Sequence, residues 1–170
     1  ASETVEEGVI IRTDPGPGQT VALGFEVQVI VSLGRSPVTV PNVANMQEDA
    51  AIALLESAGL VYGSTSQTYS PNLKKGTVVS SDPRGDAERT ADGEIIREGE
   101  TVNLVVSNGL VQVPDVTGKD IGEANSTLTG LQLSVRLNAD FGCSGNVVSY
   151  QSIVGDQAQK SEVTLQYCAG

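Results

Sequence analysis

The sequence predicts an α+β protein made of tandem small modules, each with one helix packed on a three-stranded antiparallel sheet, in an extended linear array. Three observations predict this fold class. Short motifs recur in constant order at a period of roughly 70 residues. Apolar residues at helical spacing follow each leading motif, and alternating apolar and polar residues follow these. A length of 170 residues is enough for one ordinary domain or for two to three small ones.

Three motifs carry the repeat. Residues 40–43 read Val-Pro-Asn-Val, and residues 113–116 read Val-Pro-Asp-Val. A strand that ends in Ser-x-Gly precedes each of them, at 32–34 and at 107–109. The third motif is a glycine-led apolar strand, found at 8–15, at 76–83 and, more faintly and with Ser152 in place of the proline, at 145–152. The ordered set predicts modules at 1–36, which lacks its first half, at 37–110 and at 111–170.

A helix is expected directly after each Val-Pro segment. In the second module Asn45 is predicted to open it, with Glu48 three residues later as the partner in a capping box. Gly59 is predicted to end it in the left-handed conformation. The expected buried face consists of Met46, Ala50, Leu54 and Ala58.

The third module repeats these signals. Asp120 and Glu123 occupy the cap positions, and Gly130 is the expected stop. The expected buried face consists of Ile121, Ala124 and Leu128.

Strands are predicted where apolar and polar residues alternate. The apolar members of these strands are Val27, Val29 and Val31; Val102, Leu104 and Val106; and Leu131, Leu133, Val135 and Leu137. The helix is expected to cover one face of each sheet, and the polar residues leave the other face to solvent. In the first module no helix precedes the strands, so its valines are expected to lack cover. They must then pack on a neighbour, fray, or pair with another chain.

Composition excludes several classes of function. A net charge of -11 repels nucleic-acid phosphates and anionic membranes, so neither is expected as a partner. The absence of histidine removes the commonest general base and the commonest metal ligand. Carboxylate pairs could serve a hydrolase, but modules this small leave no room for the cleft it needs. We therefore expect no catalysis, no cofactor and no metal.

Cys143 and Cys168 are the only cysteines, and both lie in the third module. A disulfide between them would close a loop of about 25 residues and stabilise the module by about 3–4 kcal/mol. The alternative is two free buried thiols. A structural disulfide requires an oxidising compartment.

Residues 84–98 form a charged insertion relative to the first module. Its acidic residues suggest calcium, but the spacing of an EF-hand loop fails, because no glycine follows Asp86 at the sixth position and Arg97 stands at the twelfth. A charged, solvated hairpin loop is the favoured interpretation.

The motifs resemble the PASTA repeat, whose pattern is Val-Pro-Asn-Val, a helix ending in Ala-Gly-Leu, a Gly-x-Val strand leading to proline, and a last strand ending in Val-Ser-x-Gly. The second module carries all of these, including Ala58-Gly59-Leu60. The first module matches in its second half only. The third matches at its leading segment and helix, but ends in Tyr-Cys-Ala-Gly at 167–170.

The resemblance implies a non-catalytic extracellular sensor region of a membrane-spanning bacterial serine/threonine kinase, cut from a longer protein. It implies binding of peptidoglycan fragments (muropeptides) or the related β-lactams, with promotion of receptor dimerisation, on the outer face of the cell membrane in the cell wall. The membrane would be reached only through the parent's transmembrane helix. The alternative is a rigid spacer, as in the tail of a penicillin-binding protein; short junctions favour this. A third hypothesis is self-association through the uncovered valines.

Binding of muropeptide carboxylates by so acidic a chain needs local cations. Aromatic residues for sugar contact are few, which predicts weak affinity. For each candidate, an ordinary surface charge or a partly buried tyrosine is the competing interpretation. The candidates are Lys74, Lys75, Lys119 and Arg136, with Tyr150, and also Tyr69, for apolar contact.

Overall fold

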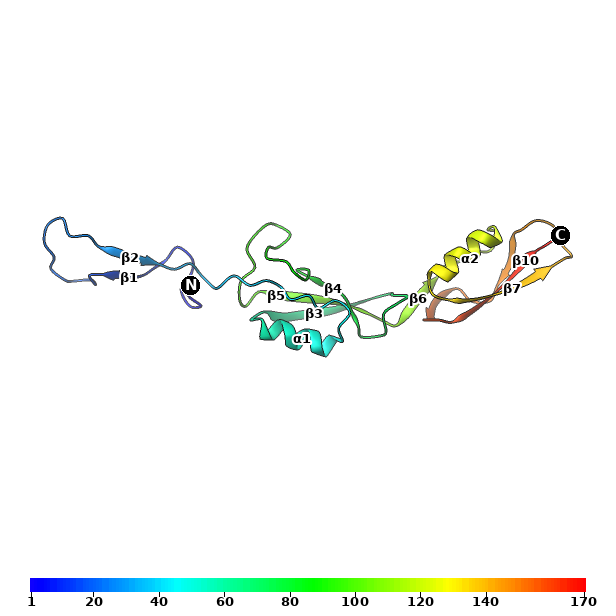
Figure 1. The fold of residues 1–170 in the computed structure, drawn as a ribbon, viewed down its shortest axis with the longest axis horizontal. Coiled ribbons are helices and arrows are strands. Elements are labelled where there is room, and N and C mark those ends of the chain that lie inside the picture. Colours follow the sequence, from blue (N-terminus) through cyan, green and yellow to red (C-terminus); the bar gives the residue numbers. More distant parts are fainter. The chain divides into compact units, whose positions relative to one another are not determined.

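Figure 1 shows the fold of the computed structural model, which describes residues 1–170. The elements follow in the order β1 (Ile10–Asp14), β2 (Gln28–Val31), α1 (Glu48–Ser57), β3 (Val61–Thr68), β4 (Val78–Asp82), β5 (Thr101–Ser107), β6 (Leu110–Val113), α2 (Ile121–Gly130), β7 (Ser134–Asp140), β8 (Val148–Gln151), β9 (Gly155–Ala158) and β10 (Glu162–Cys168). The prediction of repeated α+β modules is confirmed, since the chain has two helices and several small sheets.

Contacts divide the chain into two compact units whose segments alternate along the sequence. One unit contains Ala1–Asn42, Ile52–Gly63 and Asp82–Val102; the other contains Val43–Ala51, Ser64–Ser81 and Asn103–Gly170. We call residues 1–36, 37–110 and 111–170 the first, middle and third repeats, and these bounds remain predictions.

The two complete repeats share one strand order. The middle sheet has the order β3-β5-β4 and the third has the order β7-β10-β8, so in both cases the last strand in sequence is the central one. The first repeat contributes only the pair β1-β2. A further two-stranded sheet joins β6 to β9, with Leu110 opposite Ala158 and Val113 opposite Gly155.

The antiparallel direction predicted for the sheets is wrong for one pair in the third repeat. Strand β10 runs antiparallel to β8 but parallel to β7, with Val163 opposite Val135 and Leu165 opposite Leu137. Alternation of apolar and polar residues fixes the face that a strand buries, but not its direction. Strands β7 and β8 run in opposite directions, so β10, which lies between them, has to run parallel to one of them.

The core of the third repeat lies between α2 and one face of its sheet, and Figure 1 shows α2 beside this sheet. Ala124 and Leu128 of α2 are fully buried, as predicted, and Ile121 packs against the same core. Val163 and Leu165 supply the central strand's part of the core. Asp120 caps the helix as predicted, because its Oδ1 accepts hydrogen bonds from the backbone N–H groups of Gly122 and Glu123.

Two predictions for α1 are wrong. Its buried residues are Ala51 and Leu55, whereas Leu54 of the predicted face is 36% exposed. The helix also begins at Glu48, so Asn45 lies in the preceding turn, in the left-handed conformation with φ 66°. Gly118 holds the corresponding place before α2, since Asn45 N–H donates to Val78 O as Gly118 N–H donates to Val148 O. Asparagine is favoured both in the left-handed conformation and at the N-cap of a helix, so its identity alone does not distinguish the two roles.

Helix stops differ between the two complete repeats. Gly59 follows α1 with φ 79°, as predicted. Gly130 is instead the last residue of α2, and Gln132 takes the left-handed conformation with φ 59°. A residue with a Cβ is strained there.

We expect Gln132→Gly to raise the free energy of unfolding of the third repeat by about 0.5–1 kcal/mol, because relief of the strain exceeds glycine's entropic cost. Urea denaturation followed by circular dichroism measures it. The reverse change, Gly59→Gln, should destabilise the middle repeat, since a Cβ there would also lie 3.3 Å from Glu98 Cγ. A lower free energy of unfolding for Gln132→Gly would contradict the inference that the backbone at Gln132 is strained.

The Ser-x-Gly motif closes a loop onto the end of the last strand. In the middle repeat, the buried Ser107 Oγ donates to Leu73 O at 2.7 Å and accepts from Gly109 N–H at 3.1 Å. The buried Ser32 makes the same pair of bonds in the first repeat, to Val5 O at 2.7 Å and from Gly34 N–H at 3.0 Å. We call this arrangement the serine clasp.

The third repeat has a disulfide where the others have a serine clasp. Cys168 N–H donates to Val147 O, as Ser107 N–H donates to Thr77 O, which places Cys168 at the serine position. Its sulfur is bonded to Cys143 in the loop after β7, with the two Cα atoms 5.0 Å apart. The chain therefore has no free cysteine.

Candidate ligand-binding surface

The open face of the third sheet is the surface on which two of the predicted binding residues meet. Side chains alternate along a strand. Val163 and Leu165 of β10 are buried under α2, so the residues that alternate with them, and the residues opposite these on β7 and β8, point away from α2. The face consists of Arg136 and Asn138 on β7, Glu162, Thr164 and Gln166 on β10, and Tyr150 on β8. We call it the open face.

Strand register fixes the order of these residues. Gln166 on the central strand lies opposite Asn138 on one side and Tyr150 on the other, so an amide, an amide and a phenol form one row. Thr164 lies opposite Arg136 in the next row. Tyr150 is 53% exposed. The rows present hydrogen-bond donors and acceptors beside one aromatic ring.

Charge on the open face is nearly balanced. Arg136 Nη2 lies 3.2 Å from Glu162 Oε2, and both side chains are more than half exposed. Such a surface ion pair contributes about 0–1 kcal/mol, so a carboxylate from a ligand could replace Glu162 at little cost. The guanidinium is thus available as a bidentate anion partner within an otherwise neutral surface.

The other predicted lysines lie elsewhere. Lys119 is in the turn before α2, where its Nζ lies 3.0 Å from Glu123 Oε1. Lys74 and Lys75 belong to the loop that the Ser107 clasp holds. Lys75 packs closely against Gly109, where an added Cβ would lie 2.9 Å from Lys75 Cβ. The structure therefore brings Arg136 and Tyr150 together but not the lysines.

Tyr69, the remaining aromatic candidate, joins two repeats. A hydrogen bond between its hydroxyl and the carboxylate of Asp156 raises the pKa of Tyr69, and partial desolvation and the negative charge of Asp156 add to this. In the same region Gln159 Nε2 donates to Ser70 O and to Leu73 O. Tyr69 is thus a junction residue.

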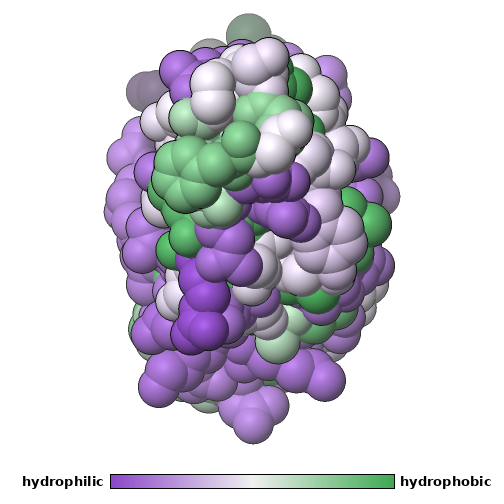
Figure 2. All heavy atoms as spheres, turned by 90° about the vertical axis from the view of Figure 1, so that its right-hand side faces the viewer, coloured by the Kyte–Doolittle hydropathy of each residue, from purple (hydrophilic) through white to green (hydrophobic).

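Hydrophilic atoms cover much of the end of the molecule that carries the C-terminus, as Figure 2 shows, and an apolar patch in the upper part of the view and smaller apolar areas elsewhere interrupt them. The large apolar side chains that the third repeat exposes are Leu137, Phe141, Val147, Tyr150 and Val154. Phe141, at 80%, is the most exposed of these.

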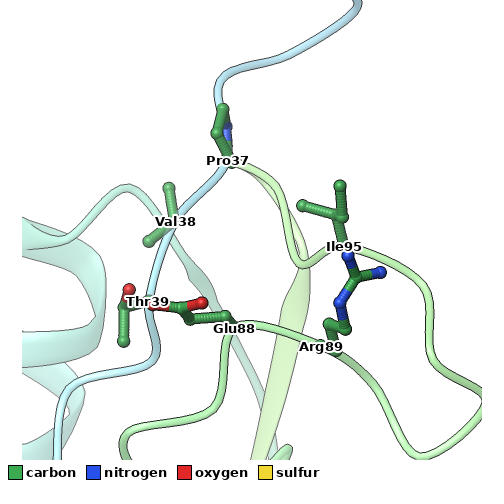
Figure 3. A pocket seen from close by; sticks show the side chains of 6 residues that line it. All are labelled: Pro37, Val38, Thr39, Glu88, Arg89 and Ile95. Carbon is green, nitrogen blue, oxygen red and sulfur yellow. The ribbon is translucent and has the colours of Figure 1, made fainter.

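The insertion at 84–98 folds into a hairpin, and part of it is buried. Arg89 and Ile95 form an isolated antiparallel β-bridge, Arg89 Nη1 donates to Gly93 O at 2.8 Å, and Ile96 is fully buried. A hollow of about 340 Å³ lies beside it, lined by Pro37, Val38, Thr39, Glu88, Arg89 and Ile95. Figure 3 shows Arg89 next to Ile95, and Glu88 beside Thr39. The residues that line this hollow include no aromatic side chain, whereas the open face offers the ring of Tyr150 together with Arg136, so the hollow is a weaker candidate.

The structure has no group of three or more His, Cys, Asp or Glu side chains that could hold a metal ion. No helix has the length and apolar character needed to cross a membrane.

Sequence reasoning missed four members of the open face: Asn138, Glu162, Thr164 and Gln166. Each reads as an ordinary outward residue of a half-solvated strand. Only the register of β10 between β7 and β8 places them beside Arg136 and Tyr150.

Comparison with known proteins agrees with the repeat pattern. Residues 38–108 match the family model described as PASTA domain. A probable serine/threonine-protein kinase of Clostridium perfringens is 31% identical over 176 residues, which cover 95% of this chain and 25% of that protein. Another, of Corynebacterium efficiens, is 36% identical over 135 residues, which cover 78% of this chain and 19% of that protein. The chain thus spans a quarter or less of these relatives.

A solved structure supports the same fold. The crystal structure of the three-PASTA-domain of a Ser/Thr kinase from Staphylococcus aureus matches with a TM-score of 0.54 and 24% identity, over 99% of this chain and 84% of that chain. These matches lie in the PASTA region, apart from the kinase domain of the relatives. Residues 38–108 therefore belong to the PASTA domain family, and the chain as a whole is similar to the non-catalytic PASTA repeat region of bacterial serine/threonine kinases.

Proposed function

We propose that this chain is the extracellular sensor region of a membrane-spanning bacterial serine/threonine kinase, which binds peptidoglycan fragments at the cell wall and promotes receptor dimerisation. The observation that carries the proposal is the match along 95% of the chain to a kinase four times its length. The Cys143–Cys168 disulfide supports an extracellular location, because disulfides persist in oxidising compartments.

We assign binding to the open face of the third repeat. Muropeptides carry hydroxyls, amides and carboxylates. Asn138, Gln166 and Thr164 match the first two groups, and Arg136 matches the third by releasing Glu162. Tyr150 offers a ring for apolar contact. A nearly flat surface with one aromatic residue predicts weak binding.

Titration of the 15N-labelled chain with a soluble muropeptide tests the proposal. We expect shifts confined to amides of β7, β8 and β10, and a loss of affinity of about tenfold in Tyr150→Ala and in Arg136→Gln, since each removes a contact worth about 1.4 kcal/mol. Lys74→Gln and Lys119→Gln are the matched controls and should bind as the parent chain does. A β-lactam, the second proposed ligand, is titrated in parallel. Unchanged spectra at millimolar muropeptide would contradict the sensor proposal.

Unchanged spectra would favour the second candidate function, a structural spacer such as the tail of a penicillin-binding protein. Hydrogen bonds and an ion pair between side chains of one repeat and the next support the spacer. Arg97 Nη2 lies 2.8 Å from Glu7 Oε2, and Arg97 Nη1 donates to Leu33 O and Arg35 O. Gln159 joins the third repeat to the middle one in the same manner. Junctions of this kind restrict bending whether or not a ligand binds.

A further inference from the structure

Strand β3 forms an edge of the middle sheet that carries no charge. It is the longest strand of the chain, with eight residues, and it has one neighbour, β5, in the sheet order β3-β5-β4. Its sequence, Val-Tyr-Gly-Ser-Thr-Ser-Gln-Thr, contains no charged residue and no proline. Edge strands pair readily with further strands unless such residues or a covering segment prevent it. The sequence of β3 therefore lacks the usual protection of a sheet edge.

The other edge strands of the two complete sheets are protected. Strand β7 carries the charges of Arg136 and Asp140. The turn before α2 is bonded to β8, because Gly118 N–H donates to Val148 O, and the turn before α1 is bonded to β4 in the same way. Strand β4 lies on the opposite side of β5 from β3, so neither kind of protection applies to β3.

The charges around β3 suit a second copy of the same strand. Residues 57–81 form the longest stretch of the chain without Asp or Glu. Two copies can therefore approach here with less of the repulsion that a net charge of -11 causes elsewhere. The two ends of β3 also differ in charge. Glu100 lies at its start, where Glu100 O accepts from Val61 N–H, whereas Lys74 and Lys75 lie in the loop that follows its end.

The serine clasp keeps this loop near the end of β3. Ser107 Oγ donates to Leu73 O, and the next residue, Asn108, donates its N–H to Thr68 O. Two copies of one strand that pair antiparallel are related by a two-fold axis, so the start of each lies beside the end of the other. Such a pair brings the positive loop of each copy toward the acidic start of β3 in its partner.

We propose that the outer edge of β3 pairs antiparallel with β3 of a second copy of this chain. This inference rests on the receptor dimerisation in the proposed function and gives it a surface. A contact of eight residues a side, without a large apolar area, produces weak association in free solution. Anchoring of two receptors in one membrane raises their effective concentration, and there a weak pairing is sufficient.

Sedimentation equilibrium of the 170-residue chain without ligand tests the pairing. We expect a monomer–dimer equilibrium with a Kd of about 0.1–1 mM. Ser66→Lys should weaken it at least about tenfold, because a lysine on the exposed edge strand blocks pairing with another strand. Ser80→Lys is the matched control and should leave the Kd unchanged, since it adds the same charge at an exposed serine of β4, the opposite edge of the same sheet.

Three outcomes would overturn the proposal. The chain could stay monomeric at millimolar concentration. Ser66→Lys could dimerise as the parent chain does, or Ser80→Lys could weaken the dimer equally, and either result would place the contact elsewhere.

Amide exchange in the parent chain keeps the test decisive if Ser66→Lys fails to fold. A higher protein concentration should slow exchange in β3 and leave exchange in β8 unchanged, and exchange in β3 that is independent of concentration would contradict the pairing. The muropeptide titration is run below the Kd for dimerisation, where the chain is a monomer. Failure of the pairing and failure of ligand binding are therefore observed separately.

Discussion

Replacement of Leu55 by alanine is expected to lower the free energy of unfolding of the middle repeat by about 3 kcal/mol, within the range of about 2–5 kcal/mol for buried leucines. Leu55 lies in α1 with none of its surface exposed. Its truncation removes apolar area from the interior and leaves a cavity, because a small module has little freedom to collapse around it. Urea denaturation with circular dichroism gives the total loss, and amide exchange in β3 to β5 assigns it to this repeat.

Leu54→Ala is the matched control, because it removes the same atoms from the adjacent position. Leu54 is 36% exposed, so we expect a loss of less than about 1 kcal/mol. The comparison separates the two possible orientations of α1 about its axis. A greater loss from Leu54→Ala than from Leu55→Ala would restore the face predicted from sequence and contradict the structure.

The helix orientation shows where sequence reasoning reaches its limit. Residues 50–55 read Ala-Ala-Ile-Ala-Leu-Leu, which is apolar all round, so two faces one residue apart satisfy the same spacing. In α2 polar residues interrupt the pattern at Glu123, Asn125 and Ser126, and only one face remains apolar. That face was predicted correctly. Sequence thus defines a helix face only where polar residues bound it.

The sheets show a related limit. Alternation predicted the burial of Val102, Leu104 and Val106, which is confirmed. It could not predict that β7 and β10 run parallel, because direction and neighbour depend on the path of the chain between them. The candidate site inherits this limit. Arg136 and Tyr150 were identified by their chemistry, but their place on one face depends on a central strand that comes last in sequence.

Replacement of both cysteines by alanine is expected to destabilise the third repeat by about 3–4 kcal/mol, because the crosslink closes a loop of about 25 residues in the unfolded chain. Reduction of the parent chain should produce a similar loss and should leave the double variant unaffected. Denaturation with and without reductant, followed by amide exchange in β7 to β10, measures both. A loss that also appears in the middle repeat would contradict a local role for the disulfide.

The serine clasp predicts that the replacement residue matters. Cys168 stands where Ser107 donates to Leu73 O and accepts from Gly109 N–H in the middle repeat. Cys143→Ser with Cys168→Ser should therefore recover about 1 kcal/mol relative to the alanine pair, the usual net contribution of one buried hydrogen bond. Equal stability of the serine and alanine pairs would mean that the disulfide does not replace a clasp. If the difference appears, the disulfide and the serine hydroxyl perform one task, which is to hold the loop after the first strand against the end of the last strand. The covalent version then differs in being reducible, so that the third repeat alone would lose stability in a reducing compartment.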